Sequence, residues 1–159
     1  MKFITELKPN EVIVVGTNST GFHGAGLAGF AFRGESRNNW REDAFFLRAM
    51  KAPVGHPDRI GKWAVFGVSR GLQQGREGAS YGIETIKRGG LRRSTPPSEI
   101  KQQFVGLFKR AIEDPHRQYL MTPVGTQLAG YSSLEIQAIW DEVAVECDGI
   151  PANVVTCKF

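Results

Sequence analysis

The hydrophobic pattern of the chain alternates between short apolar runs and longer stretches with helical spacing. The short runs predict strands at residues 12–15, 63–66, 80–83, 119–122 and 153–156. The longer stretches predict helices at residues 25–34, 42–50, 98–112 and 132–147. Because strands and helices follow one another along the chain, the pattern predicts an α/β sandwich with a mixed or largely parallel sheet and helices on both of its faces.

Two of these helices carry start signals in the sequence. Ser98 follows two prolines and is a candidate N-cap. Ser132 and Glu135 have the spacing of a capping box at the start of the last helix. In a largely parallel sheet, ligands bind beyond the carboxyl ends of the strands, so the segments that follow the strands are the first place to look for chemistry.

Residues 16–29 form a glycine-rich loop between the first strand and the first helix. Glycine lets backbone N–H groups approach a phosphate, and a helix N-terminus favours an anion. The alternative is a tight turn that binds no ligand. The motif G-x-G-x-x-G is present at residues 24–29, but it does not follow the strand directly and no acidic residue ends a following strand. No Lys-Ser or Lys-Thr pair follows either, so dinucleotide-binding and P-loop sites are disfavoured.

Two further segments are expected at the same edge of the sheet. Residues 84–87 follow the strand at 80–83, and residues 124–131 form a second glycine-containing loop before a helix. Two such loops at one edge favour a site that holds a diphosphate between two helix N-termini. Glu84 is a candidate general base if it faces this cleft, and otherwise a solvated carboxylate.

Two other segments each allow a functional and a structural interpretation. Residues 67–78 are glycine-rich and predict either a mobile hairpin or a flap that brings Arg70 or Arg76 to a phosphate. Residues 87–93 are basic and predict either a solvated loop or a nucleic-acid-binding segment. Because only Tyr81 is an aromatic residue near this basic segment, stacking on bases is poorly supported.

Composition limits the class of protein. A length of 159 residues favours one domain, and 20 basic against 16 acidic residues give a mild positive charge that suits anionic partners but is no nucleic-acid signature. The histidines and cysteines lack metal-ligand spacing. Cys147 and Cys157 lie in apolar patterns, which predicts buried thiols and a cytoplasmic protein. The first residues are too charged for a signal peptide, and no apolar run reaches membrane-spanning length.

Three motifs, taken together, resemble a known family. They are Asn18 with His23-Gly-Ala-Gly-Leu-Ala28, Gly71-Leu-Gln with Ser80-Tyr-Gly-Ile-Glu-Thr85, and Gly125-Thr-Gln-Leu-Ala-Gly-Tyr131. This combination resembles a macro-domain-like group of small bacterial and phage proteins. The order of the loops is also similar to the macro-domain branch that removes ADP-ribose from protein carboxylates. The resemblance runs from about residue 11 to the C-terminus, except for residues 35–62, which look like an insertion.

The resemblance implies a macro-domain-like α/β/α sandwich with a mixed sheet, a single nucleotide-binding domain without a cofactor. Gly24, Ala25 and Gly26 are expected to lie against the distal ribose and the diphosphate, and residues 125–129 form the second phosphate loop. The full set of expected ligand-binding residues is Thr17, Asn18, His23, Gly24, Ala25, Gly26, Leu27, Thr85, Gly125, Thr126, Gln127, Leu128, Ala129 and Tyr131.

The residues of the catalytic macro branch are not matched. The branch places a lysine where this chain has Thr85 or Ile86, and Lys87 is displaced from that position. Its aspartate in the second loop corresponds to Ala129, and Gln127 replaces a small glycine. No catalytic residue is therefore assigned. His23 is predicted to order its loop by hydrogen bonding, with acid–base catalysis as the alternative.

The sequence thus favours a protein that binds ADP-ribose or a related diphosphate nucleotide. One alternative is an enzyme that hydrolyses an ADP-ribosyl bond with other residues. A second is a nucleic-acid-binding module that uses the basic loop at residues 87–93.

Overall fold

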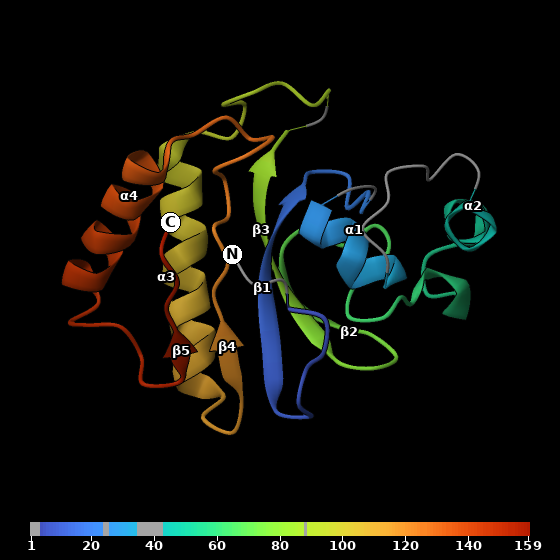
Figure 1. Cartoon of the computed structure of the whole chain (residues 1–159), viewed down its shortest axis with the longest axis horizontal. Coiled ribbons are helices and arrows are strands. Elements are labelled where there is room, and N and C mark those ends of the chain that lie inside the picture. The colour runs from blue at the N-terminus through green and yellow to red at the C-terminus, as the bar shows by residue number, and fades with distance from the viewer. Residues whose placement is uncertain (1–3, 24–25, 35–42, 88) are drawn as a thin grey trace.

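The computed structural model describes residues 4–23, 26–34, 43–87 and 89–159. Over these residues the chain is an α/β protein with a five-stranded mixed sheet, mostly parallel, and four α-helices (Figure 1). The strands are β1 (Glu11–Asn18), β2 (Gly71–Gln74), β3 (Ala79–Ile86), β4 (Gln118–Leu120) and β5 (Val154–Val155). The helices are α1 (Gly26–Arg33), α2 (Ala44–Lys51), α3 (Pro97–Glu113) and α4 (Ser133–Glu146), with a single 3-10 turn, η2 (Pro57–Arg59).

The strands lie in the order β2-β3-β1-β4-β5, with β1 at the centre. β1 pairs in parallel with β3 and with β4, β4 pairs in parallel with β5, and β2 alone is antiparallel, on β3. The apolar run at residues 12–15 is at most 1% exposed, as expected for a central parallel strand covered on both faces. The carboxyl ends of β1, β3 and β4 therefore share one edge of the sheet.

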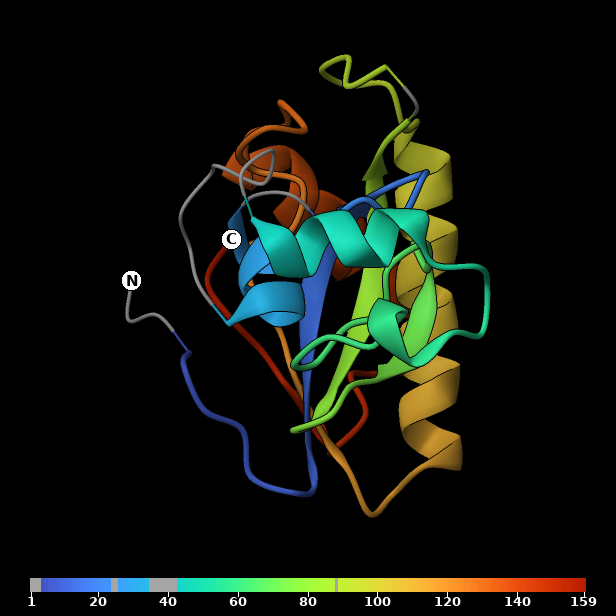
Figure 2. The ribbon, with the colours of Figure 1, turned by 90° about the vertical axis from the view of Figure 1, so that its right-hand side faces the viewer.

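The two faces of the sheet support separate cores. Val12 and Val14 of β1 face α3 and α4, where Phe104 and Trp140 meet edge to face with ring centroids 5.1 Å apart. Ile13 and Val15 face the opposite way, toward α1 and α2. Figures 1 and 2 show this division, with α3 and α4 together on one side of the sheet and α1 and α2 on the other.

One predicted strand is wrong. Residues 63–66 form no strand, and Val65 makes only an isolated bridge to Ile60. The backbone N–H groups of Trp63 and Ala64 instead donate to the carbonyl of Ala31 at the end of α1, at 2.6 and 3.1 Å. The apolar run is therefore buried as a loop against α1, because its backbone groups are satisfied by the helix end and not by a neighbouring strand.

The glycine-rich segment at residues 67–78 is a hairpin whose first arm belongs to the sheet. Residues 71–74 form β2, with Leu72 opposite Tyr81. Arg76 donates from Nε to the carbonyl of Ile60 (2.8 Å) and from Nη2 to that of Pro57 (3.0 Å). Its guanidinium thus holds the neighbouring loop, and the predicted hairpin is confirmed by the antiparallel pairing of residues 71–74 with β3.

One of the two helix start signals predicted from the sequence is confirmed. Ser132 Oγ accepts from the N–H of Glu135 (3.1 Å), and Glu135 Oε1 accepts from the N–H of Ser132 (3.2 Å), which confirms the capping box. The prediction of Ser98 as an N-cap is wrong. Pro96 occupies the cap position of α3 without a side-chain hydrogen bond, because Pro97 already takes the first helical position that suits proline.

The segment predicted as an insertion, residues 35–62, is described from residue 43 onward; residues 35–42 lie outside the described part. Asp43 caps α2 by accepting from the N–H groups of Phe45 (3.0 Å) and Phe46 (3.4 Å). Phe46 and Ala49 are fully buried in the second core. Residues 43–52 are therefore part of the packing that supports α1.

Cys147 and Cys157 are free thiols, as predicted, and each is half-buried where the sequence predicted a buried thiol. Burial raises the pKa of Cys157 to about 11. None of the helices in the described part of the chain has the length and apolarity needed to span a bilayer.

Candidate functional site

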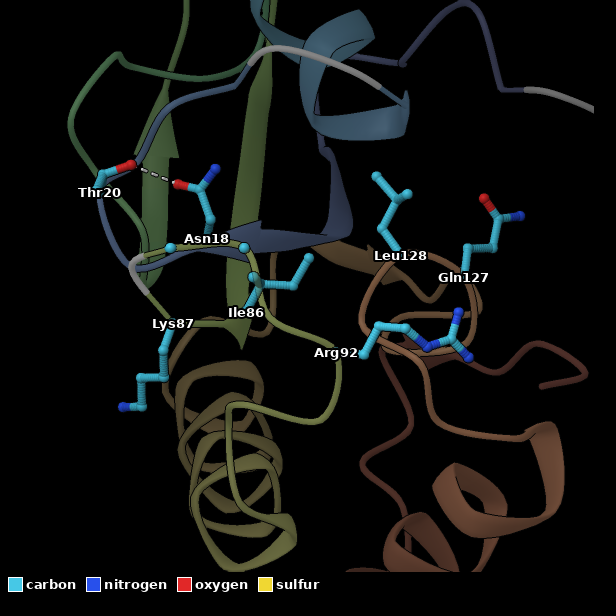
Figure 3. A pocket seen from close by; sticks show the side chains of 9 residues that line it. Asn18, Thr20, Ile86, Lys87, Arg92, Gln127 and Leu128 are labelled. Carbon is cyan, nitrogen blue, oxygen red and sulfur yellow. Dashed lines mark hydrogen bonds between the residues drawn. The ribbon is translucent and has the colours of Figure 1, made fainter.

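A pocket of about 450 Å³ opens at the carboxyl ends of β1 and β3. The two strands end side by side, with Asn18 paired to Ile86 across a register shift. The pocket is bordered by the loop after β1, the loop after β3 and the loop after β4 (Figure 3). Its lining residues are Asn18, Thr20, Ile86, Lys87, Gly89, Gly90, Arg92, Gln127 and Leu128. Its volume falls in the range of small-molecule sites.

The first loop is shaped by the side chain of Asn18. Asn18 Oδ1 accepts from the N–H of Phe22 (2.9 Å) and from Thr20 Oγ1 (2.8 Å), and Asn18 Nδ2 donates to the carbonyl of Phe22 (2.9 Å). Gly21 sits inside this turn at φ +66, where an added Cβ would come within 2.3 Å of the Gly67 carbonyl carbon. The amide of Asn18 is thus used to fix the turn at the mouth of the pocket.

Thr17 and Thr85 are buried beneath the pocket and are not among the residues that line it. Thr17 Oγ1 donates to the carbonyl of Ser69, and Thr85 Oγ1 lies 3.5 Å from the carbonyl of Thr17. A Cβ at Gly16 would approach Thr85 Oγ1 to 3.2 Å, so the glycine leaves room for the threonine. These two predicted ligand residues therefore hold neighbouring strands and the loop before β2.

His23 is buried on the side of the sheet that carries α1 and α2, near the ring of Phe32. Only 1% of its surface is exposed, and it does not line the pocket. Its Nε2 lies 2.9 Å from the carbonyl of Val65, which makes Nε2 the protonated nitrogen. Nδ1 is buried and has no hydrogen-bond partner among the described residues. Burial lowers the pKa of His23, so the ring is neutral near pH 7. The geometry agrees with a histidine that connects two loops.

The second glycine loop is closed by its own hydrogen bonds. The N–H of Tyr131 donates to the carbonyl of Gly125 (3.1 Å), and Thr126 Oγ1 donates to the carbonyl of Pro123 (2.7 Å). Gly125 has φ +80, and a Cβ there would lie 2.9 Å from Ile136 Cδ1 of α4. Glycine is required at this position by both its backbone conformation and its closeness to the helix.

The basic loop at residues 87–93 is joined to this second glycine loop. The N–H of Arg93 donates to the carbonyl of Ala129 (2.7 Å), and Tyr131 Oη donates to the carbonyl of Thr95 (2.6 Å). The Arg93 guanidinium makes two hydrogen bonds to Glu135, at 2.6 and 2.7 Å, and lies 5.0 Å from the centroid of the Tyr131 ring. Arg93 holds the pKa of Glu135 down to about 2.

Lys87 belongs to a network of four charged side chains. Its Nζ lies 2.5 Å from Glu99 and 3.8 Å from Glu84, and Arg70 pairs with both carboxylates. The hydrogen bond from Lys87 is the main reason that the pKa of Glu99 is lowered. β3 continues through Glu84 to residue 86, so the prediction that its strand ends at 83 is wrong, and the Glu84 carboxylate is buried in this network.

Arg92, Gln127 and Leu128 form the side of the pocket contributed by the two joined loops. In Figure 3, Arg92 extends from the basic loop toward the loop that carries Gln127 and Leu128, while the Lys87 side chain runs away from it. Arg92 packs across Gly130, whose added Cβ would lie 3.0 Å from Arg92 Cβ. Leu128 is 69% exposed and offers an apolar surface beside the guanidinium.

The structure brings three of the predicted site residues into this pocket: Asn18, Gln127 and Leu128. Gly26 opens α1 at φ +61 and is exposed, and Leu27 packs against the second core. Gly24 and Ala25 lie outside the described residues. Thr126 is half-buried, whereas Gly125, Ala129 and Tyr131 are buried and shape the second loop from within.

The predicted set of ligand-binding residues did not include Thr20, Ile86, Lys87, Gly89, Gly90 or Arg92. Ile86 is the last residue of β3, and Lys87, Gly89 and Gly90 follow the true end of the strand, so the correct strand length would have pointed to them. Arg92 lies in the basic run that was considered only for nucleic acid. Its neighbours come from residues 125–131, and that long-range pairing leaves no local sequence signal.

Within residues 4–23, 26–34, 43–87 and 89–159, no three His, Cys, Asp or Glu side chains gather as a metal site would require. No protein-family model matches this chain, and no curated protein matches it. The site therefore has to be interpreted from its own geometry.

Proposed function

We propose that this chain is a macro-domain-like protein that binds ADP-ribose or a related diphosphate nucleotide in the pocket between β1 and β3. The observation that carries the proposal is the position of the pocket. The chain leaving β1 enters α1 on one face of the sheet, and the chain leaving β3 enters α3 on the other face. A crevice at the carboxyl ends of two such strands is the usual ligand site of open α/β sheets.

The two glycine loops support a phosphate-containing ligand at this position. Asn18 and Thr20 come from the first loop, and Gln127 and Leu128 come from the second. Of the motifs that resemble the macro-domain-like group, the first and the third thus each contribute residues to the pocket lining. Glycines at the start of α1 and in the loop before α4 allow an anion to come close to the backbone, and the N-terminus of a helix favours an anion.

The chemistry of the pocket favours binding over turnover. Its described lining contains neither a carboxylate nor an imidazole. Ala129 is buried where the catalytic macro branch has an aspartate, and the Lys87 ammonium is held by Glu99. Glu84, the carboxylate considered as a general base, is paired with Arg70 and Lys87.

The nucleic-acid alternative draws less support from the same region. Lys87 and Arg93, at the two ends of the basic loop, are engaged by Glu99 and Glu135. Charges that are paired within the protein contribute less to binding phosphates along a strand. A salt titration separates the alternatives, because nucleic-acid binding falls steeply with ionic strength.

Calorimetric titration of wild type and Gly26→Val with ADP-ribose tests the proposal. A Cβ at Gly26 meets nothing within 4 Å, and Gly26 is not among the residues that line the pocket. Valine there tests whether the phosphates of the ligand extend from the pocket to the start of α1. Gly26 has φ +61, so any side chain there strains the backbone. Gly55→Val is the matched control, because Gly55 has φ +88, is equally unobstructed and lies between α2 and η2, outside both glycine loops.

We expect Gly26→Val to weaken ADP-ribose binding at least about tenfold, with Gly55→Val close to wild type, since one charge-assisted hydrogen bond contributes about 1.5–3 kcal/mol. If both variants lost the same affinity for ADP-ribose, the loss would come from backbone strain and not from an obstructed ligand. The absence of heat with every diphosphate nucleotide at millimolar concentration would refute the proposal itself.

A further inference from the structure

Two adjacent arginines in the loop after β3 have different partners. Arg93 is bound on both sides, by Glu135 through two hydrogen bonds and by the Tyr131 ring. Arg92 is exposed at the pocket, and within the described part of the chain its guanidinium forms no ion pair or hydrogen bond. The other cation that lines the pocket, Lys87, is paired with Glu99. Arg92 is therefore the cation of the described lining that remains available to a ligand.

The position of Arg92 is fixed although none of the described residues pairs with its charge. Gly130 has φ +87, and an added Cβ there would lie 3.0, 3.1 and 3.3 Å from Cβ, Nε and Cγ of Arg92. The side chain therefore lies flat across the glycine backbone. Packing of the aliphatic part restricts the rotamers of the side chain, which lowers the entropy lost when the guanidinium binds an anion.

The backbone on either side of Arg92 is fixed as well. Arg93 has φ 56, a left-handed conformation that costs energy for a residue with a side chain. That conformation is held by the hydrogen bond from the N–H of Arg93 to Ala129 and by the pair with Glu135. The N–H of Lys87 donates to Ser94 Oγ (2.8 Å), which closes the loop around Arg92. The bonds of Arg93 thus fix the backbone next to Arg92 and position the Arg92 side chain at the pocket.

We propose that Arg92 is the phosphate-recognising side chain of the pocket, so that the site selects nucleotides by their phosphates more than by their base. This proposal rests on the proposed function, and it names the phosphates as the part of the ligand that the site recognises. A guanidinium offers two parallel N–H donors to two oxygens of one phosphate, a geometry that lysine does not provide. Gln127, which also lines the pocket, has an amide that suits a hydroxyl or phosphate oxygen of the same ligand.

The test compares ADP-ribose, ADP and adenosine by calorimetric titration of four proteins. These are wild type, Arg92→Met, Arg92→Lys and Lys109→Met. Lys109→Met removes the same single charge from an exposed position near the other end of α3. Thermal unfolding of each variant shows that the fold is retained.

Wild type should prefer ADP to adenosine at least about tenfold, because a charge-assisted hydrogen bond to phosphate contributes about that factor or more. Arg92→Met should remove most of this preference and weaken ADP-ribose about tenfold, while adenosine binding stays unchanged. Arg92→Lys should fall between the two, and Lys109→Met should match wild type.

Two outcomes would overturn the role of Arg92 while the proposed function stands. The first is an Arg92→Met protein that binds ADP-ribose as wild type does. The second is a wild-type protein that binds adenosine as tightly as ADP. A wild-type protein that binds none of the three compounds would instead refute the proposed function.

Discussion

At the scale of single residues, His23 shows how a polar side chain next to a glycine loop serves the fold. Its Nε2–H donates to the carbonyl of Val65. Val65 precedes Phe66, which packs against the second core. His23 thereby ties the first glycine loop to the segment between η2 and β2. An imidazole with no described partner on Nδ1 and almost no exposure is poorly placed to exchange protons with a ligand.

The burial of His23 predicts a pH dependence of stability. Burial lowers its pKa in the folded protein below the ordinary value of 6.5, so the unfolded chain binds a proton first as the pH falls. The free energy of unfolding should therefore decrease as the pH falls below about 6.5, until the folded form is protonated too. Urea unfolding of wild type and His23→Asn between pH 5 and 8 measures this.

His23→Asn lacks the titrating ring, so its stability should decline less over the same interval. The difference between the two proteins isolates His23 from the carboxylates that titrate in both. Parallel pH profiles for wild type and variant would show that His23 is not the group responsible.

At the scale of elements, the loop after β1 is shaped by a close approach between two backbones. A Cβ at Gly21 would lie 2.3 and 2.5 Å from backbone atoms of Gly67 and Val68. Gly21→Ala should therefore destabilise the protein by about 2–5 kcal/mol, from overpacking together with a left-handed alanine. Gly149→Ala also has a positive φ (+113) but meets nothing within 4 Å.

Chemical denaturation of these two variants separates the two costs. Gly149→Ala should lose about 1–3 kcal/mol from backbone strain alone, because φ +113 is a conformation that residues with a side chain rarely adopt. If Gly21→Ala loses no more than Gly149→Ala, the first loop does not pack against residues 67–68 as closely as described.

The helix starts give a second prediction at this scale. Ser132 caps α4, so Ser132→Ala should lower the free energy of unfolding by about 1 kcal/mol. Ser98 stands inside the first turn of α3 and caps nothing, so Ser98→Ala should be nearly neutral. A larger loss in Ser98→Ala than in Ser132→Ala, measured by urea unfolding, would contradict the cap positions given above.

The elements that the sequence predicted well are those whose signals are local. The buried run of β1 and the apolar stripe of α3 need no distant partner to be recognised, and the Ser132 capping box lies within four residues. The failures depend on tertiary context. Residues 63–66 look like a strand but find their backbone partners at the end of α1, and β2 is a strand only because β3 lies beside it.

At the scale of the whole molecule, the same distinction applies to the candidate site. That loops after parallel strands meet at one edge follows from topology, which placed residues 16–29 and 124–131 there. Within these loops, Asn18, Gln127 and Leu128 were expected from the resemblance to the macro-domain-like group. Arg92 was not, because its role depends on the packing of the basic loop against Gly130 and on the pairing of its neighbour Arg93 with Glu135. The spacing of residues in the sequence does not show which of several arginines has no carboxylate partner among the described residues.

The arrangement also predicts that removal of ADP-ribose from protein carboxylates by a lysine–aspartate pair is absent. Lys87 is paired with Glu99, and Ala129 offers no carboxylate. Incubation with a glutamate-modified protein should release no ADP-ribose above the rate without protein. Robust turnover that disappears in Lys87→Ala would show that Lys87 reaches the reacting bond.

The central claim is that the pocket at the carboxyl ends of β1 and β3 binds a diphosphate nucleotide. Calorimetric titration of the wild-type protein with ADP-ribose tests it most directly, with NAD, AMP and ATP for comparison. The account predicts saturable heat with ADP-ribose that is weakened at least about tenfold in Gly26→Val, the size expected for loss of a charge-assisted hydrogen bond. No heat with any diphosphate nucleotide at millimolar concentration, from a protein that is folded by thermal unfolding, would contradict it.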